Sequence, residues 1–349
     1  MNRIQDEILV SIQCATFNQE SYIRQCLDGF VMQQTNFRFE AIVHDDASTD
    51  NTAAIIQEYA NKYPDIIQPI FETENQYSKH NGSITRIMRQ HMRGKYIAFC
   101  EGDDYWIDPL KLQKQVDLLE QDPEIGLVNT ENHVLYEEEG VLLECYNRKK
   151  NRINSKTAIE QVAISELLSS RYFIKTGSVC LRRDLYEEYA KSDEYQYIRA
   201  HFPFGDIPLW VYIASKKKLA YIEDPTMVYR RHIGSASNLN SIRKRLYFYL
   251  KGTEFRMYCL NTYEVSDIKY KDQAVQNYEQ SLCDYLSFVP DYAYIYPVSQ
   301  QAERKIQKIR QCQLIRFGHR AIYILKMHIH SLVRYIYRKF RYCLSLGAH

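Results

Sequence analysis

Apolar segments of strand length alternate with segments of helical periodicity through the first 130 residues, and this alternation constrains the fold more than any other feature. The strand candidates are ILVSIQCATF, FEAIVHDD, IIQPIFE, KYIAFCEGDD and IGLVNTENHVLY. The helix candidates between them are SYIRQCLDGFVMQQ, a segment capped by Thr49 or Asp50 that runs to Asn61, residues 82–92, and a segment from Pro109 to Leu119. Strands that alternate with helices of roughly 10–15 residues predict a mainly parallel, Rossmann-like α/β sheet with helices on both faces.

The pattern changes in the second half of the chain. Residues 137–156 are polar and irregular, and strands recur near SVCLRR and KLAYIEDPTMVY. From about residue 238 onward the periodicity is mostly helical. We therefore expect one α/β domain over 1–237, divided into halves at 130/131, followed by a helical extension over 238–303 and a tail over 304–349.

Nine cysteines are scattered along the chain without any C-x-x-C pair. This pattern argues against a zinc ribbon or a disulfide framework, and it is typical of a reducing cytosol. The segment MNRIQDEILV lacks the apolar run of a secretion signal, and no stretch of 18 uncharged apolar residues is present. We expect a cytoplasmic protein without a membrane-spanning helix.

Polar clusters directly follow three of the predicted strands. They are Thr16, Asn18 and Glu20; His44, Asp45, Asp46 and Ser48; and Glu101, Asp103 and Asp104. Because ligands bind outside the carboxyl ends of parallel strands, we expect these clusters to meet at one edge. Acids gathered there repel one another unless a cation lies between them, and Mg²⁺ or Mn²⁺ favours carboxylates together with substrate phosphates. The alternative is that each cluster only caps a strand-to-helix turn.

Three segments together resemble the family two nucleotide-sugar glycosyltransferases of the A-type fold. They are VSIQCATFNQESYIRQCL, AIVHDDASTDNT and GKYIAFCEGDDYWIDPLKLQKQ, with a weaker match in FGDIPLW followed by MVYRRHIGSAS. The resemblance covers roughly residues 7–237. It implies an enzyme that transfers a sugar from a nucleotide-sugar, with a UDP-sugar as the first candidate, to an acceptor hydroxyl.

The resemblance implies a donor site at the first polar clusters. The segment from Thr16 through Asn18 to Glu20 corresponds to the loop that holds the base and ribose of the donor. Asp46 corresponds to the carboxylate that accepts a hydrogen bond from the base, and Ser48 lies in the same donor loop.

The resemblance implies a metal site at the third cluster. Glu101-Gly102-Asp103 occupies the position of the family's D-x-D motif, with Glu in place of the first Asp. Asp103 is the first candidate metal ligand and Asp104 the second, and both Asp104 and Glu101 are also expected to contact the donor. The longer Glu101 side chain leaves open a contact with ribose or water instead of the metal. The expected ion is Mn²⁺ or Mg²⁺.

The resemblance also implies roles for residues in the second half. Asp206 of Phe204-Gly205-Asp206 corresponds to the general base that activates the acceptor, which would give inversion at the anomeric carbon. The alternative is that Asp206 caps the helix over 207–216. His232 corresponds to a residue near the diphosphate and is a candidate metal ligand. Residues 234–237 would form a loop that closes over the donor. Tyr105 and Trp106 are candidates for the wall of the acceptor site, and core packing is the alternative for Trp106.

The last 46 residues differ in charge from the rest of the chain. No Asp or Glu follows Glu303, whereas residues 304–349 contain 11 Lys and Arg. Apolar residues recur there at steps of three or four, from Leu314 and Phe317 to Phe340 and Leu344. This pattern predicts a basic amphipathic helix on an anionic membrane surface, here the inner face of the cytoplasmic membrane. A helix that packs on the catalytic domain or binds a partner remains open, and nucleic acid is not expected because the body is acidic.

The expected function is therefore sugar transfer to a glycan or lipid-linked glycan in the biosynthesis of a bacterial surface polysaccharide. Two alternatives come from other classes. One is a non-catalytic nucleotide-sugar or partner-binding module on the same fold. The other is a nucleotidyltransferase, which is disfavoured because Ala15-Thr16-Phe17-Asn18 stands where that class carries a glycine-rich phosphate loop.

Overall fold

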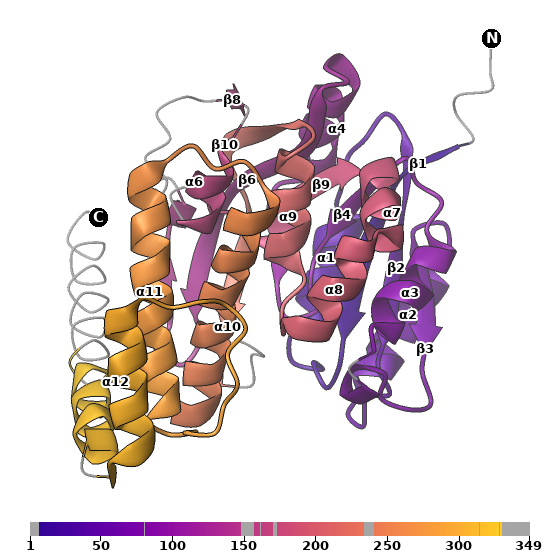
Figure 1. Cartoon of the computed structure of the whole chain (residues 1–349). Coiled ribbons are helices and arrows are strands. Elements are labelled where there is room, and N and C mark those ends of the chain that lie inside the picture. Colours follow the sequence, from indigo (N-terminus) through magenta and orange to yellow (C-terminus); the bar gives the residue numbers. More distant parts are fainter. Residues whose placement is uncertain are drawn as a thin grey trace, which may run out of the picture. The chain divides into compact units, whose positions relative to one another are not determined.

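The structure is a computed structural model, and it describes residues 7–79, 81–147, 157–160, 162–169, 173–233, 241–313, 315–327 and 329. Contacts divide the chain into two units (Figure 1). The first comprises the residues up to 137 together with 142–231, and the second comprises 138–141 and the residues from 232 onward. The division of the chain at 130, 237 and 303 stays a prediction.

The strands of the first unit form one ten-stranded sheet. They are β1 (Ile8–Thr16), β2 (Arg38–Asp45), β3 (Ile67–Phe71), β4 (Tyr96–Phe99), β5 (Tyr105–Trp106), β6 (Ile125–Tyr136), β7 (Val141–Leu143), β8 (Thr157–Glu160), β9 (Val179–Arg182) and β10 (Lys218–Arg231). The order along the sheet is β3-β2-β1-β4-β9-β6-β10-β5, while β7 pairs with β6 and β8 with β10.

The sheet is parallel in its first four strands and mixed beyond them. β3, β2, β1 and β4 run parallel, as do β6 and β10. β9 is antiparallel to both β4 and β6, and the short strands β5 and β8 pair antiparallel with β10. The predicted α/β class and the parallel N-terminal half are confirmed, and the antiparallel insertion of β9 is a feature that the sequence pattern did not indicate.

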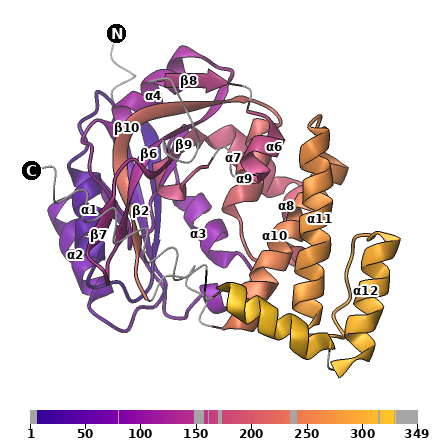
Figure 2. The same ribbon diagram turned by 90° about the vertical axis from the view of Figure 1, so that its left-hand side faces the viewer.

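The helices of the first unit cover both faces of the sheet (Figure 2). They are α1 (Ile23–Val31), α2 (Thr52–Lys62), α3 (Ser83–His91), α4 (Lys111–Gln121), α6 (Ile164–Leu168), α7 (Arg183–Lys191), α8 (Asp193–His201) and α9 (Asp206–Ala214), with 3-10 turns η1 (Tyr77–Lys79) and η2 (Thr176–Ser178). Alternate side chains of β4 separate the two faces. Tyr96 and Ala98 join the core with α1, α2 and α4, whereas Phe99 packs edge-on against Tyr186 and Trp210 of α7 and α9.

Two predicted helix caps differ from the observed ends. α2 begins at Thr52 and its N-cap position is Asn51, so neither Thr49 nor Asp50 is the N-cap, although Asp50 Oδ1 accepts a hydrogen bond from the Thr52 backbone N–H at 3.0 Å. Asp206 is the first residue of α9 and not its N-cap, and its Oδ1 accepts a bond from Ile207 N at 2.8 Å. The second carboxylate oxygen of Asp206 therefore remains available to other groups.

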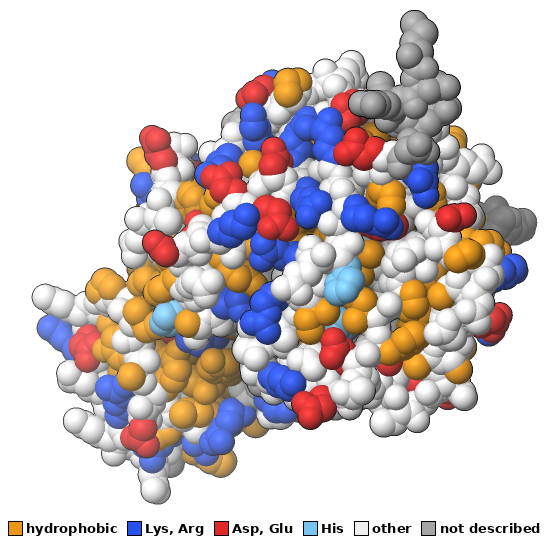
Figure 3. Space-filling view, turned by 90° about the vertical axis from the view of Figure 1, so that its right-hand side faces the viewer, with side chains coloured by type: hydrophobic (Ala, Val, Ile, Leu, Met, Phe, Trp, Pro, Cys, Tyr) orange, Lys and Arg blue, Asp and Glu red, His pale blue; other side chains and the backbone are white. Residues whose placement is uncertain are grey.

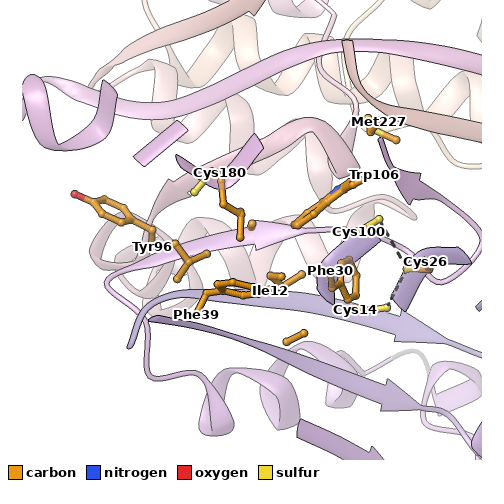
Figure 4. Packing of buried hydrophobic residues seen from close by; sticks show 14 of the residues in the cluster. Ile12, Cys14, Cys26, Phe30, Phe39, Tyr96, Cys100, Trp106, Cys180 and Met227 are labelled. Carbon is orange, nitrogen blue, oxygen red and sulfur yellow. Dashed lines mark hydrogen bonds between the residues drawn. The ribbon is translucent and has the colours of Figure 1, made fainter. Parts of the chain in front are cut away.

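The core beneath the first polar edge contains aromatic rings and four thiols, three of which lie close together (Figure 4). Trp106 is 2% exposed, packs edge-on against Phe30, and donates its indole N–H to Gly177 O at 3.0 Å. The Cys26 Sγ lies 3.9 Å from that of Cys14 and 4.0 Å from that of Cys100. Of the two predictions for Trp106, the structure supports core packing.

The second unit is helical and has its own core. It contains α10 (Ile242–Thr262), α11 (Ile268–Leu286) and α12 (Gln300–Gln311), and residues 315–327 are also helical. Apolar residues from the three named helices meet in one cluster, among them Leu250, Leu282 and Ile306. The predicted helical C-terminal region is confirmed. Within the described residues, no helix has the length and apolar character needed to cross a bilayer.

Candidate active site

The carboxyl ends of β1, β2 and β4 bring the first three polar clusters to one edge of the sheet. Thr16 pairs in register with Asp45, and Gln13 pairs with Phe99. Past the strand ends, the backbone N–H of Asp46 donates to Thr16 O at 3.0 Å, and that of Gly102 donates to Ala15 O at 3.2 Å. The three loops are thus tied together by main-chain hydrogen bonds, as the parallel arrangement predicts.

The loops after β1 and β2 are also joined by their side chains. Asn18 Oδ1 accepts a bond from Thr49 N at 2.8 Å, and Ser48 Oγ accepts one from Asn18 N at 2.9 Å. Glu20 Oε2 accepts bonds from the backbone and side-chain N–H groups of Asn51 at 2.9 and 2.8 Å. These contacts hold the predicted donor loops in one shape, and direct contact of these residues with a donor remains a prediction.

Asp46 has a definite partner in the structure that the sequence did not indicate. Its carboxylate is 2% exposed and accepts bonds from Gln76 N at 2.6 Å and Tyr77 N at 2.9 Å. It therefore anchors the segment between β3 and α3 at this edge. Each carboxylate oxygen can accept a second hydrogen bond, so the predicted contact with a nucleobase is still a chemical possibility for Asp46.

Four carboxylates gather beside these loops. Glu101 is accessible to solvent, yet the surrounding protein together with the negative charges of Asp103 and Asp206 raises its pKa to about 7. Asp104 is almost fully buried, and burial together with Asp103 and Glu101 raises its pKa well above the usual value. Its Oδ1 accepts a bond from Arg230 N at 2.8 Å. The mutual repulsion shows that Asp206, from a distant part of the chain, lies near the 101–104 loop.

A lysine from the second half of the chain lies among these acids. Lys175 has its pKa lowered to about 8, because burial and the positive charge of Arg231 outweigh the attraction of Asp104, Glu101 and Asp206. Lys175 is not among the predicted site residues, because a single lysine before a Thr-Gly turn has no distinctive spacing. The only available signal was its place just before the strand predicted in SVCLRR.

The 175–177 segment is held by contacts with the acids and with the core. Thr176 Oγ1 donates to Asp206 Oδ2 at 3.5 Å, and Gly177 O accepts the bond from Trp106. A Cβ added at Gly177 would lie 2.9 Å from Met227 Cε and 3.7 Å from Asp104 Oδ2. Gly177 therefore allows a close approach to β10 and to the acid loop that a larger residue would prevent.

The arginines after β10's apolar half differ in their surroundings. Arg230 is buried, and its guanidinium donates to Gln25 Oε1 at 2.6 Å. The same guanidinium lies 3.4 Å from Glu137 Oε2 and stacks over the Tyr22 ring. The buried Nε atoms of both Arg230 and Arg231 lack a hydrogen-bond partner in the described part of the chain. Since Arg230 already bonds Gln25, Arg231 is the arginine with more hydrogen-bonding capacity left for a phosphate.

The carboxylates fit a hard divalent cation in their chemistry but do not complete a cage. Four carboxylates lie close together, and the repulsion between their negative charges favours a cation among them. Within the described ranges, no three His, Cys, Asp or Glu side chains converge as a ready-made metal site. This arrangement suits Mg²⁺ or Mn²⁺, which commonly take one or two carboxylates and complete their shell with water and substrate phosphates.

Among the candidate ligands, Asp103 is half-buried at the cluster, while Asp104 already accepts the Arg230 backbone bond. His232 follows β10 as the first residue of the long part of the second unit. Its predicted metal contact stays a prediction. The predicted closing loop at 234–237 lies outside the described residues.

Comparison with known proteins identifies the family. The family model described as glycosyl transferase family 2 matches residues 11–187, just over half of the chain. The chain is 38% identical over 223 residues to an uncharacterized protein of Mycobacterium tuberculosis, a match of 64% of this chain and 59% of that protein. It is 30% identical over 114 residues, 33% of this chain and 42% of the relative, to an Escherichia coli protein named UDP-Glc:alpha-D-GlcNAc-diphosphoundecaprenol beta-1,3-glucosyltransferase.

Solved structures show a similar fold at low identity. S. aureus TarS 1–349 in complex with UDP-GlcNAc matches with a TM-score of 0.53 and 16% identity, over 86% of this chain and 79% of that one. A mannosyltransferase from Pyrobaculum calidifontis in complex with GDP-Man and Mn²⁺ matches with a TM-score of 0.52 and 15% identity, over 90% and 86%. These likenesses confirm the predicted A-type fold. The chain belongs to glycosyl transferase family 2.

Proposed function

We propose that this chain transfers a sugar from a nucleotide-sugar to a hydroxyl of a glycan or lipid-linked glycan, in the biosynthesis of a surface polysaccharide. The observation that carries the proposal is the meeting of Glu101, Asp103, Asp104 and Asp206 beside Lys175, at the strand edge where the two donor loops end. Acids and cations side by side suit a metal-bound diphosphate.

The names of similar proteins support the choice of substrates. The E. coli relative is named for UDP-Glc as donor and a diphosphoundecaprenol-linked sugar as acceptor. TarS is described in complex with UDP-GlcNAc, and the Pyrobaculum enzyme with GDP-Man. We take a UDP-sugar as the first donor to test and a GDP-sugar as the second.

Asp206 is the proposed general base. It sits in the first turn of α9, and one of its oxygens accepts the Ile207 backbone bond while the other faces Thr176. The remaining lone pairs are free to take the proton of an acceptor hydroxyl as that oxygen attacks the anomeric carbon. With this base the reaction is a single displacement with inversion, and the NMR coupling of the product's anomeric proton tests it.

Asp103 is the proposed first metal ligand, with Asp104, Glu101 and His232 as the other candidates for metal or donor contacts. A bound Mn²⁺ or Mg²⁺ would neutralise charge on the departing nucleotide diphosphate. Thr16, Asn18, Glu20, Asp46 and Ser48 are the proposed base and ribose contacts. Each of these assignments rests on position in the family motifs and on the placement described above.

Thermal unfolding tests the donor site directly. A ligand that binds only the native state raises the melting temperature according to RT ln(1 + [L]/Kd). We expect Mn²⁺ with one of UDP-, GDP-, CMP- or dTDP-sugars to raise it, and Asp103→Ala to abolish the shift. Asp65→Ala, which removes an exposed carboxylate outside the motifs, is the matched control.

The non-catalytic alternative predicts a different outcome in the same experiment. A binding module without activity would show the thermal shift but no metal-dependent hydrolysis of the donor. No shift with any nucleotide-sugar, with or without metal, would contradict donor binding altogether and leave only the fold. A nucleotidyltransferase would instead show a shift with a nucleoside triphosphate.

We also propose that the basic tail binds the inner face of an anionic membrane, where a lipid-linked acceptor would lie. Phe317, Ile322, Leu325 and Ile329 are 54–69% exposed, and Arg and Lys residues lie between them. Elsewhere, the visible face in Figure 3 mixes acidic and basic side chains. Exposed apolar residues with Arg and Lys between them on one helix are typical of interfacial helices.

Flotation with vesicles that contain an anionic phospholipid tests the tail. Removal of everything after residue 303 would also remove the buried Ile306 and Ile309, so substitutions in the full chain are preferable. We expect the full chain to float and the Phe317→Ser/Leu325→Ser variant to float less. Equal flotation of the two proteins would contradict the membrane role.

A further inference from the structure

The ammonium of Lys175 lies against aromatic rings and makes no polar contact with the described residues. Its Nζ lies 3.4 Å from the centre of the Tyr229 ring and 5.2 Å from that of Phe173. No hydrogen-bond acceptor and no carboxylate oxygen within 4.0 Å serves it in the described part of the chain. An ammonium has three donors, so this cation is stabilised by aromatic faces while its hydrogen-bonding capacity stays unused.

The backbone around Lys175 is fixed in place. Lys175 O accepts bonds from Ser178 N at 2.9 Å and from Ser178 Oγ at 2.7 Å. Thr176 Oγ1 donates to Asp206. Gly177 lies close to Asp104, and its carbonyl accepts the hydrogen bond from Trp106. Lys175 is therefore attached to the acid cluster by its neighbours, while its own ammonium forms no ion pair with the described acids.

Arg231 supplies a second uncommitted cation at the same place. Its charge is close enough to lower the pKa of Lys175, its guanidinium lies over Tyr136 and Tyr229 at 5.4 and 5.9 Å, and its buried Nε has no partner among the described residues. Two like charges beside one tyrosine repel each other. A folded protein keeps such a pair most readily where an anion comes to rest between them.

We infer that Lys175, with Arg231, binds the diphosphate of the nucleotide donor. Lys175 would then complement the carboxylates: they would hold the metal, and Lys175 would bind the phosphate oxygens. This assignment rests on the proposed function, because it requires a nucleotide diphosphate in the site. Diphosphate oxygens are acceptors only, so they match three ammonium donors and an orphaned guanidinium N–H.

A structural counter-ion is the competing role, and it makes a different prediction. A lysine that only neutralises the acids would form an ion pair with one of them, as Lys114 does with Asp108 at 2.8 Å. Lys175 forms none. Removing the charge of Lys175 would leave the carboxylates without a nearby cation and should strengthen binding of a free divalent cation. If Lys175 binds the diphosphate, the same change should weaken binding of a diphosphate.

Two titrations of the full chain test the assignment. The variants are Lys175→Met, Lys175→Arg and the control Lys216→Met, which removes a surface lysine paired with Glu188. The first titration follows Mn²⁺ alone by the electron paramagnetic resonance of the free ion. The second follows UDP and GDP by calorimetry at saturating Mn²⁺, with uridine and guanosine as ligands that lack phosphate.

The expected pattern has opposite signs for metal and diphosphate. Lys175→Met should bind Mn²⁺ alone about 2- to 10-fold more tightly. It should bind the preferred nucleoside diphosphate on the order of 10- to 100-fold more weakly, because charge-assisted bonds are lost, and should bind the nucleoside unchanged. Lys175→Arg should retain most of the diphosphate affinity, and Lys216→Met should match the unaltered protein.

Three outcomes would overturn the assignment, and they differ from one another. Unchanged diphosphate affinity in Lys175→Met would remove Lys175 from the site and leave the proposed function standing. Equal weakening of Mn²⁺, nucleoside and diphosphate would make Lys175 a structural residue. Failure of the unaltered protein to bind any nucleoside diphosphate would overturn the proposed function and the assignment together.

Discussion

Two groups of polar residues meet at the same edge of the sheet, and they differ in how far the protein itself supplies partners for their hydrogen-bonding groups and charges. The loops after β1 and β2 bond mainly to each other, through Asn18 with Thr49 and Glu20 with Asn51. The acid loop after β4 instead gathers carboxylates whose charges oppose one another, beside a lysine that pairs with none of them.

The difference teaches where a ligand is needed. Several hydrogen bonds within the protein join the first two loops, so their shape should persist without any bound molecule. The acid loop has unbalanced charge that the folded chain does not neutralise, and its stability should respond to metal and diphosphate. Unbalanced charge in an enclosed place is a common property of functional sites.

Asp206→Asn tests the acid group with the largest expected effect. It keeps the shape of the side chain but removes the base, so we expect sugar transfer to fall by roughly 10²- to 10⁴-fold. Metal-dependent binding of the donor, followed by thermal shift, should be preserved. Asp193→Asn, in the first turn of the neighbouring helix α8, is the control. A variant that transfers sugar at the normal rate would exclude Asp206 as the base.

Asn18→Ala tests the hydrogen-bonded loops. Asn18 has a φ of 50° and accepts the Thr49 bond, so alanine loses the bond and occupies a strained backbone conformation. We expect the free energy of unfolding to fall by about 1–2 kcal/mol in urea titrations. Asn18→Gly should lose less, because glycine adopts this φ freely. An equal loss in the two variants would show that backbone strain contributes nothing there.

The buried Lys111 extends the comparison to the core below the loops. Its Nζ donates to Gln115 at 2.7 Å and lies 4.2 Å from the Trp106 ring centre, and burial lowers its pKa to about 8. A lysine with a lowered native pKa costs stability at low pH, and this cost shrinks as pH rises from about 8 toward its ordinary value of 10.5.

Lys111→Met should remove that pH dependence. Between pH 7.5 and 9.5 we expect the unaltered protein to gain about 1–2 kcal/mol of unfolding free energy relative to Lys111→Met. Urea titrations of both proteins at the two pH values measure the difference in their unfolding free energies. Contributions from titrating groups that the two proteins share cancel in this difference. A difference that stays constant with pH would mean that Lys111 is ordinary in the folded state.

Glu101→Gln has the smallest expected effect, and its sign is the informative part. Because desolvation by the surrounding protein and the repulsion from Asp103 and Asp206 raise the pKa of Glu101 to about 7, its ionised form destabilises the metal-free protein, and this cost builds up as the pH rises from 4.5 to about 7. After allowance for solvent screening of an exposed group, we expect Glu101→Gln to raise the unfolding free energy by about 0.5–1 kcal/mol at pH 8 in EDTA. Below pH 4.5, where the carboxyl is protonated in both the folded and the unfolded chain, the gain should disappear, and a loss of stability at pH 8 would contradict the raised pKa.

Periodicity in the sequence was sufficient to predict the frame of the first unit. IGLVNTENHVLY is β6 from end to end, and the apolar runs around Cys14, Val43 and Ala98 are the central strands β1, β2 and β4. Buried parallel strands are continuous apolar runs, so their position shows in composition alone. Their carboxyl ends then determine where Thr16, Asp46 and Glu101 meet.

Contacts between distant segments could not be predicted in the same way. Lys175 reaches the acid loop because β9 inserts antiparallel between β4 and β6, and no local pattern records the pairing partner of a four-residue strand. Asp46 bonds to Gln76 and Tyr77 because a loop returns to it from β3. Both contacts depend on tertiary placement of segments without regular periodicity.

Gly102 has a consequence for protein engineering. A Cβ at this position would lie 2.3 Å from Gln19 Oε1 and 2.8 Å from Thr16 Oγ1, so the backbone of the acid loop rests directly on the first donor loop. Neither loop can be exchanged alone without a collision or a gap. A graft intended to change the donor must carry residues 13–20 and 99–104 as a single module, and libraries that vary positions 16, 19 and 102 need to vary them jointly.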